Sequence, residues 1–247
     1  MRVLRAAWRL LQAIAHALAG WRTIVFAFPK LTQRERDECV TVWSRGMLQV
    51  LGIGLQLRGT PPERGPMLLV ANHISWLDIL VMHAARHCRF VSKAQVRHWP
   101  LIGTLATGGG TLYIERESRR DAMRVVHRMA DALRDGDILA VFPEGTTTDG
   151  LTLLPFHANL VQAAISAGAP VQPVALSFLD QASRRTSFAA SYVGDETLVG
   201  SLWRTLSAPP VTAVVVFGEP QAAQGRDRRA WAADLREAVA SLREMPP

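Results

Sequence analysis

The sequence is poor in several residue types, and each shortage excludes something. Only two of its 247 residues are cysteine, Cys39 and Cys88, which excludes a disulfide framework and indicates reduced thiols in a protein that faces the cytosol. Lysine is as scarce, since 26 of the 28 basic residues are arginine, and we assign no function to the arginines as a class. There is no internal repeat and no low-complexity linker. At 49% hydrophobic residues the chain can bury a full core, and its length suits one α/β domain with an appendage better than two equal domains.

Acidic residues are absent from residues 1–30. The basic residues in this stretch are Arg2, Arg5, Arg9, Arg22 and Lys30. Such an excess of positive charge indicates an anionic partner, either a membrane surface or a nucleic acid. No aromatic platform or recognised nucleic-acid motif accompanies the charge, so we expect membrane lipids and no nucleic acid.

The same stretch has the pattern of an amphipathic helix. One face, repeating every three or four residues, carries Arg2, Arg5, Arg9, Gln12 and His16. The other face is apolar and contains Leu4, Trp8, Leu11, Ala15 and Leu18, with Leu10, Ile14 and Trp21 alongside. A basic face, an apolar face and two tryptophans are typical of a helix that lies in the membrane interface.

The apolar run within this helix is short. Residues 10–21 carry no charge, but a spanning helix needs about 20 residues. Arg22 then interrupts the run before residues 23–28 resume it. We therefore expect a shallow or re-entrant anchor, peripheral or monotopic on the cytoplasmic face of the membrane. Two alternatives stay open: a cleaved secretory signal with a site at residues 17–19, and a helix that packs onto its own domain without lipid.

From about residue 53 short apolar runs alternate with amphipathic stretches. The predicted strands cover residues 53–57, 67–71, 89–92, 111–114, 138–142, 171–178 and 211–217. The clearest helix runs from Ser118, a capping residue, to Arg134 and stops at Gly136, and further helices follow Trp76, Pro155 and Arg226. This alternation predicts an α/β fold: a mixed, mostly parallel sheet of about seven strands covered by helices. We divide the chain into a membrane-associated helical segment, residues 1–45, and a catalytic domain, residues 46–247.

Polar residues follow the second predicted strand. Asn72, His73 and Asp78 come where the strand gives way to a helix, and open α/β sheets place their sites at such strand ends. A carboxylate that holds the proton of one imidazole nitrogen leaves the other nitrogen free to act as a base. The alternatives are a structural histidine with satisfied hydrogen bonds and a metal site built from His83, His87 and Asp78.

Two further strands end in charged or turn-forming residues. Residues 110–116 lead from glycine through a strand to Arg116. This arginine can bind an anion, or it can form surface ion pairs with the neighbouring glutamates. Residues 142–146, with the sequence FPEGT, form a sharp turn after a buried strand, and its backbone N–H groups can bind a phosphate or a developing oxyanion.

Taken together these segments resemble the 1-acylglycerol-3-phosphate acyltransferase family of glycerolipid acyltransferases. The NHxxxxD signature is matched by Asn72, His73 and Asp78, and FPEGT is present in full. The second block ends in Glu115 and Arg116, with Glu115 where aspartate is usual, and the fourth block is similar to residues 171–175, with proline in an apolar strand. The four blocks occur in family order over residues 45–220.

The resemblance implies a role for each position. His73 is expected to be the general base and Asp78 its orienting carboxylate, while the substrate contacts are expected from Asn72, Arg116, Glu144, Gly145 and Thr146. The donor is expected to be acyl-CoA or acyl carrier protein, and no cofactor or metal is implied. Because a thiolate leaves readily, neither Ser75 nor Cys88 is needed as a nucleophile.

One departure concerns the acceptor. Relatives commonly have arginine after EGT, whereas this chain has Thr147, Thr148 and Asp149. We expect 1-acyl-sn-glycerol-3-phosphate as acceptor and phosphatidic acid as product, because Arg116 is retained. The alternative acceptor is a lyso-ornithine lipid, which lacks phosphate. The alternative classes are a hydrolase, although no G-x-S-x-G elbow is present, and a non-catalytic lipid-binding protein at the membrane surface.

Overall fold

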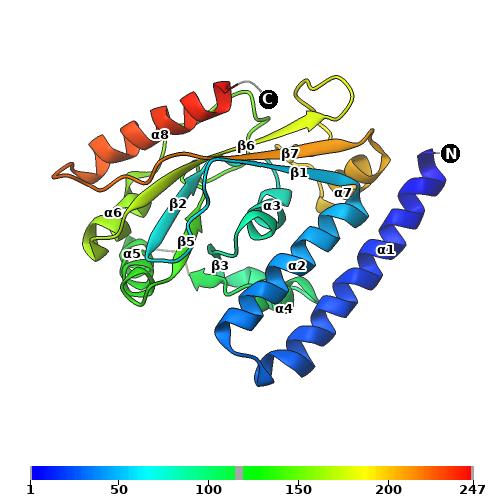
Figure 1. Ribbon diagram of the computed structural model, residues 1–247, viewed down its shortest axis with the longest axis horizontal. Helices are drawn as coiled ribbons and strands as arrows, with labels where there is room; N and C mark the ends of the chain where they lie inside the picture. Colours follow the sequence, from blue (N-terminus) through cyan, green and yellow to red (C-terminus); the bar gives the residue numbers. More distant parts are fainter. Residues whose placement is uncertain (1, 115–118, 246–247) are drawn as a thin grey trace.

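A seven-stranded sheet organises the part of the chain that the computed structural model describes, residues 2–114 and 119–245 (Figure 1). The strands are β1 (Ile53–Arg58), β2 (Met67–Ala71), β3 (Arg89–Lys93), β4 (Leu112–Ile114), β5 (Ile138–Val141), β6 (Val171–Asp180) and β7 (Val211–Phe217). Their order is β1-β7-β6-β2-β5-β3-β4, and every neighbouring pair is parallel except β6 with β7. The predicted mixed, mostly parallel sheet is confirmed.

Helices cover both faces of the sheet. They are α1 (Arg2–Arg22), α2 (Gln33–Leu51), α3 (Leu77–Ala85), α4 (Ile102–Gly108), α5 (Arg119–Arg134), α6 (Ala158–Ala167), α7 (Leu198–Ser207) and α8 (Arg228–Glu244), with a 3-10 turn, η3, at Ala94–His98. Figure 1 shows α1, α2, α3 and α7 on one side of the sheet and α5, α6 and α8 on the other. Each side has its own buried apolar cluster, so the central strands β2, β5 and β6 are covered on both faces.

Amphipathic or apolar patterns predicted α3, α5, α6 and α8, which the structure confirms. The expected capping residue Ser118 lies outside the described residues. Gly136 follows α5 with φ +91°, a conformation that glycine adopts without strain. The sequence patterns did not predict α4 or α7, both of which contain glycine, a residue that lowers helix propensity: Gly103 and Gly108 in α4 and Gly200 in α7.

The N-terminal helix is longer than its uncharged run. After α1 the chain continues through a π-helical turn, η1 (Thr23–Ala27), and a 3-10 turn, η2 (Phe28–Lys30). Arg22 thus interrupts the apolar pattern but not the helix. The whole segment Arg2–Lys30 has 29 residues and is long and apolar enough to cross a membrane. The functional division predicted between residues 1–45 and 46–247 falls within α2 and stays a prediction.

One side of α1 packs against the protein's own helices. Small residues at a spacing of seven, Ala6, Ala13 and Gly20, are buried against α2 and α7. His16, from the predicted basic face, stacks on Trp43 of α2 with ring centroids 5.4 Å apart, and Trp43 Nε1 donates to the His16 carbonyl at 3.0 Å. The basic face is therefore partly used for packing within the molecule.

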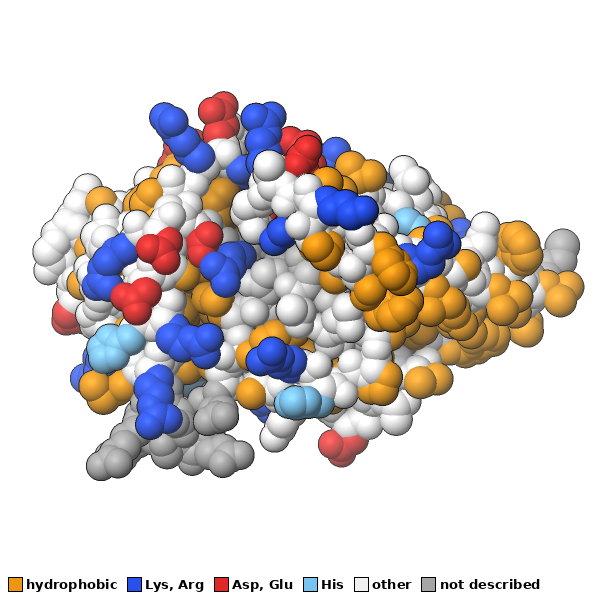
Figure 2. Space-filling model, turned by 90° about the horizontal axis from the view of Figure 1, so that it is seen from below, with side chains coloured by type: hydrophobic (Ala, Val, Ile, Leu, Met, Phe, Trp, Pro, Cys, Tyr) orange, Lys and Arg blue, Asp and Glu red, His pale blue; other side chains and the backbone are white. Residues whose placement is uncertain are grey.

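The opposite side of α1 is exposed and apolar. The large exposed apolar side chains on α1 are Val3, Leu4, Trp8, Leu11, Ile14, Leu18 and Trp21, most of them three or four residues apart, and Val25 and Phe26 of η1 follow them. Figure 2 shows apolar side chains gathered at the end of the molecule that α1 occupies. A contiguous exposed stripe of this length marks a surface that contacts protein or lipid.

Candidate active site

The candidate site lies at the carboxyl end of β2, which pairs in parallel with β5 and β6. Parallel strands bring the loops that follow them to one edge of the sheet. β6 continues beyond β2, and the buried Asn72 joins the two segments there: its Nδ2 donates to the Leu176 carbonyl at 3.0 Å, and its Oδ1 accepts from the Leu176 N–H at 2.8 Å. Both polar atoms of Asn72 therefore fix the backbone just before His73.

His73 and Asp78 are paired. Nδ1 of His73 lies 2.7 Å from Oδ2 of Asp78. The same carboxylate oxygen accepts the backbone N–H groups of Ile74, at 2.6 Å, and Ser75, at 2.9 Å. Asp78 is in the first turn of α3 and fully buried, so these donors and the positive end of the helix dipole stabilise its negative charge.

This pairing determines which nitrogen of the neutral ring carries hydrogen. An ionised carboxylate can only accept, so Nδ1 of His73 must be the donor. Nε2 of the neutral imidazole then has a free lone pair. The His73 side chain is 19% exposed, which leaves it accessible to a substrate, whereas Asp78 is not exposed at all. The arrangement is that of a general base with its orienting carboxylate.

Aromatic side chains hold the imidazole from the other side. Phe142, the first residue of FPEGT, stacks on His73 with ring centroids 4.0 Å apart and planes 5° from parallel. Phe90 of β3 stacks in turn on Phe142 at 5.6 Å. His73 therefore has one ring orientation fixed by a hydrogen bond and a stacking contact.

Glu144 connects the β5 turn to the β2 loop. Its Oε1 accepts the His73 backbone N–H and its Oε2 accepts the Leu154 N–H, both at 2.8 Å. The side chain is buried, and burial raises the pKa of Glu144, while the two backbone N–H donors act in the opposite direction. Both carboxylate oxygens are occupied by the protein itself.

Gly145 and Thr146 are exposed at the turn beside this brace. Gly145 has φ +74°, and a Cβ there would lie 3.0 Å from the His157 ring, so both conformation and space favour glycine. Thr147 donates its hydroxyl to the Tyr192 carbonyl. Asp149 accepts the N–H groups of Leu151 and Thr152, and these bonds lower the pKa of Asp149.

Arg116 lies outside the described residues, so the predicted second block is placed only as far as Ile114, the last residue of β4. Its role as a substrate contact stays a prediction.

The metal alternative finds no support among the described residues, which contain no group of three or more potential ligands. His83 and His87 stack on each other at 5.4 Å, but Asp78 is engaged by His73. Burial lowers the pKa of His83 to about 3, which keeps its ring neutral. Burial likewise raises the pKa of the Cys88 thiol, which makes that side chain a poor nucleophile.

Sequence reasoning missed three residues around the site. Phe142 was visible within FPEGT but was not singled out. Thr148 donates its backbone N–H to the His73 carbonyl at 2.9 Å. Arg243, in the last turn of α8, donates to the carbonyls of Gly150 and Leu151 and so anchors the same loop across more than 90 positions of sequence. No local pattern signals such a contact.

Comparison with known proteins places this geometry in a family. Residues 55–177 match the family described as Acyltransferase. The chain is 38% identical to the 1-acyl-sn-glycerol-3-phosphate acyltransferase of Neisseria meningitidis over 209 residues, which cover 84% of this chain and 81% of that protein. The chain belongs to the acyltransferase family.

Two other comparisons bear on acceptor and fold. The acyltransferase is also 38% identical to the lyso-ornithine lipid O-acyltransferase of Pseudomonas aeruginosa over 245 residues, covering 97% of this chain and 92% of that protein. Its fold matches the crystal structure of the 1-acyl-sn-glycerophosphate (LPA) acyltransferase from Thermotoga maritima, with a TM-score of 0.72, 17% identity and coverage of 99% and 97%. This chain thus shares its α/β fold with the Thermotoga protein, while the acceptors named for its relatives differ.

Proposed function

We propose that this acyltransferase moves a fatty acyl chain from a thioester, acyl-CoA or acyl carrier protein, to the free hydroxyl of a lysolipid. The observation that carries the proposal is the 2.7 Å contact between His73 Nδ1 and the buried Asp78 carboxylate, which leaves Nε2 of the partly exposed imidazole for the substrate. Nε2 of His73 takes the hydroxyl proton as the oxygen attacks the thioester carbonyl carbon. The C–S bond then breaks, and the leaving thiolate receives the proton from His73, which gives an ester and a free thiol.

The surrounding residues have supporting roles in this mechanism. Asp78 orients the ring and stabilises the imidazolium that forms. In the exposed turn at Gly145 and Thr146 the Gly145 N–H already donates to the Phe142 carbonyl, so the Thr146 N–H is the group suited to stabilise charge on substrate oxygens. Asn72 and Glu144 serve substrate binding indirectly, because Asn72 fixes the backbone just before His73 and Glu144 accepts the backbone N–H of His73 itself. The chemistry requires no metal or prosthetic group.

The preferred acceptor is 1-acyl-sn-glycerol-3-phosphate, which makes the product phosphatidic acid and the role phospholipid biosynthesis. Arg116 supplies a guanidinium suited to a phosphate. A lyso-ornithine lipid is the second candidate, because Thr147 stands where relatives commonly have arginine and because the Pseudomonas relative is as similar as the Neisseria one.

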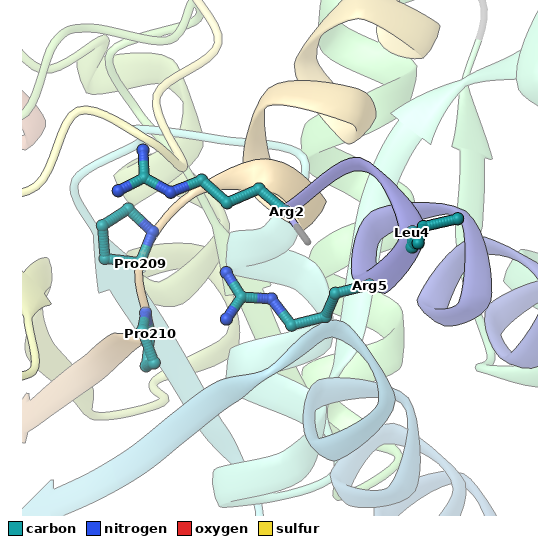
Figure 3. A pocket seen from close by; sticks show the side chains of 5 residues that line it. All are labelled: Arg2, Leu4, Arg5, Pro209 and Pro210. Atoms are coloured by element: carbon teal, nitrogen blue, oxygen red, sulfur yellow. The ribbon is translucent and has the colours of Figure 1, made fainter.

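The enzyme is proposed to work as a monotopic protein on the cytoplasmic face of the membrane. The exposed apolar side of α1 would enter the lipid, and the helix would lie along the surface because its other side packs against α2 and α7. Figure 3 shows Arg2 and Arg5 reaching toward Pro209 and Pro210 while Leu4 points away from them. Two guanidinium groups at the edge of an apolar stripe suit anionic lipid head groups.

A direct assay tests the proposal. Purified protein in lipid nanodiscs is incubated with labelled acyl-CoA or acyl carrier protein and a panel of lysolipids, and the product is identified by mass spectrometry. Transfer to lysophosphatidic acid supports the preferred acceptor, and transfer to lyso-ornithine lipid alone supports the second candidate. Hydrolysis of the thioester without transfer to any lysolipid contradicts the proposal.

A further inference from the structure

A polar cavity lies beyond the loop that follows FPEGT, and the residues assigned to catalysis, His73 and Asp78, do not line it. Its volume is about 580 Å³, within the range of small-molecule sites. The floor is apolar and is formed by Leu179, Val214, Val216 and Leu242. The rim carries Arg58, Arg184, Arg185 and Arg243. We propose that this cavity binds the phosphorylated part of the thioester donor, an inference that rests on the proposed function.

The charge of the rim favours an anion. Two carboxylates, Asp149 and Glu244, line the cavity beside the four arginines, so its formal balance is +2. Asp149 is engaged by two backbone N–H groups of its own loop. An apolar floor below a positive rim suits a ligand with both phosphate and uncharged parts.

Two of these arginines present guanidinium groups that no carboxylate neutralises within the described part of the chain. Arg184 Nη2 donates to the neutral Gln56 Oε1 at 3.0 Å, and the structure gives the exposed Arg185 side chain no hydrogen bond or ion pair there. Arg184 also has φ +59°, an uncommon conformation for a residue other than glycine. Arg243, by contrast, already donates to the Gly150 and Leu151 carbonyls, so we assign it to the cavity wall and not to ligand binding.

The cavity is next to the candidate active site but separate from it. Ile74, the residue after His73, lines the cavity, as do Gly150 and Leu151. The Thr148 N–H bonds the His73 carbonyl, so one loop forms the boundary between the two spaces. The imidazole itself turns the other way, against Phe142.

This separation distinguishes donor from acceptor. In lysophosphatidic acid the phosphate is only one carbon removed from the carbon that bears the reacting hydroxyl, so an acceptor phosphate must bind close to His73. In CoA and in acyl carrier protein the phosphate is joined to the sulfur by the long pantetheine arm. A phosphate held beyond the 148–151 loop therefore matches the donor.

The position of the cavity in the fold agrees with this assignment. Its lining includes residues from the last turns of α8, on the face of the sheet opposite α1 and α2 (Figure 1), and also Ile74, Leu176 and Phe178 of the apolar cluster on the α1 side. The membrane-facing helix and His73 ring lie on the α1 side. The α8 wall of the cavity is the part through which a water-soluble donor can approach from the side away from the lipid.

A ratio of rate constants tests the proposal. kcat/KM is measured for acyl-CoA and for the same acyl group on N-acetylcysteamine, which lacks phosphate, using the full chain in nanodiscs. In the double variant Arg184→Gln/Arg185→Gln the ratio of the first value to the second should fall at least about tenfold, because charge-assisted hydrogen bonds to phosphate are lost. The double variant Arg184→Lys/Arg185→Lys should recover most of the loss, which separates charge from folding. Where acyl carrier protein is the donor used, it replaces acyl-CoA in the ratio.

The matched control removes two exposed arginines from the first turn of α8, in Arg228→Gln/Arg229→Gln, and should leave the ratio within about twofold. An unchanged ratio in Arg184→Gln/Arg185→Gln overturns the proposal. A higher acceptor KM in that variant, with an unaltered donor KM, also overturns it. Calorimetry with CoA or the phosphopantetheinylated carrier protein reports binding without turnover. Loss of that binding in the Gln double variant supports the site even if no transfer is observed, and equal binding by both proteins contradicts it.

Discussion

Glu144 accepts a hydrogen bond from the backbone N–H of His73 at 2.8 Å, although the two residues are 71 positions apart in the chain. The contact joins the turn after β5 to the loop after β2 and sets the position from which the imidazole projects. Because the other carboxylate oxygen holds Leu154, one buried side chain braces two loops. The proposed general base is therefore positioned by a residue that does not hydrogen-bond to its ring.

Replacement of this brace should reduce turnover. In Glu144→Gln one of the two backbone N–H groups would face the amide NH₂, a donor, so a bond worth about 1.5–3 kcal/mol is lost. We expect kcat to fall about 10- to 100-fold with little change in donor KM. The free energy of unfolding should fall by less than the worth of that bond. Burial raises the pKa of Glu144, and removing its charge relieves the cost of keeping a carboxylate away from water. Steady-state kinetics and urea unfolding measure the two effects.

Glu38→Gln is the control for that variant, since Glu38 is exposed and, among the residues that the structure describes, forms its ion pair with Arg34 on α2. It should change stability by less than about 1 kcal/mol and leave kcat unchanged. Equal kinetics for Glu144→Gln and the wild type would show that the brace does not position His73.

Asp78→Asn should keep the fold but slow the reaction. The amide oxygen can still accept from His73 Nδ1 and from the Ile74 and Ser75 N–H groups, but the negative charge that stabilises the imidazolium is gone. Loss of such a contribution typically costs 10²- to 10⁴-fold in kcat. The measurement is kcat with saturating donor and acceptor, with circular dichroism to verify the fold. A decrease of less than about fivefold would contradict the role given to Asp78.

The exposed side of α1 should control membrane binding. Deleting the helix would also expose the surfaces of α2 and α7 that it covers, so point substitutions are the cleaner test. Trp8→Ser/Leu11→Ser should weaken sedimentation with anionic vesicles about tenfold or more, because each large apolar side chain contributes about 1.5–3 kcal/mol when fully buried in lipid.

A matched control for this prediction is Met123→Ser on α5. Met123 is 63% exposed and Trp8 is 62% exposed, but Met123 lies on the other side of the sheet. Its replacement should not alter vesicle binding. If the α1 variant binds vesicles as well as the control does, the membrane contact lies elsewhere on the protein.

Acceptor choice should depend on Thr147 and Arg116. For a lysophosphatidic acid acceptor, Thr147→Arg should be tolerated or lower the acceptor KM, and Arg116→Ala should raise the acceptor KM about tenfold or more without changing the donor KM. Thr147→Val is the control, because it removes the hydroxyl bond to Tyr192 without adding charge. Acceptor KM values for lysophosphatidic acid and lyso-ornithine lipid decide the matter. Two results together would reverse the preferred acceptor. The wild type would not acylate lysophosphatidic acid, and Thr147→Arg would acylate lyso-ornithine lipid more slowly than the wild type does.

Much of the fold was predictable because its strands are short apolar runs with clear boundaries. The pairing of His73 with Asp78 was also predictable, since both lie within one loop and the first turn of α3. Contacts across the sheet were not: nothing near Arg243 in sequence signals that it meets Gly150, and Glu144 gave no sign that its partner would be a backbone N–H.

The orientation of α1 shows the same limit. Periodicity predicted a basic face and an apolar face, but not which one faces the protein. That choice depends on Ala6, Ala13 and Gly20, whose small size lets α2 and α7 approach on one side.

The central claim is that His73 is the general base of acyl transfer, and His73→Ala tests it most directly. The measurement is the rate of transfer from a thioester donor to the accepted lysolipid by the full-length variant, folded as judged by circular dichroism. We predict a loss of about 10²- to 10⁴-fold in kcat, because an un-ionised alcohol attacks a thioester poorly without a base. Transfer by folded His73→Ala protein at close to the wild-type rate would contradict the mechanism.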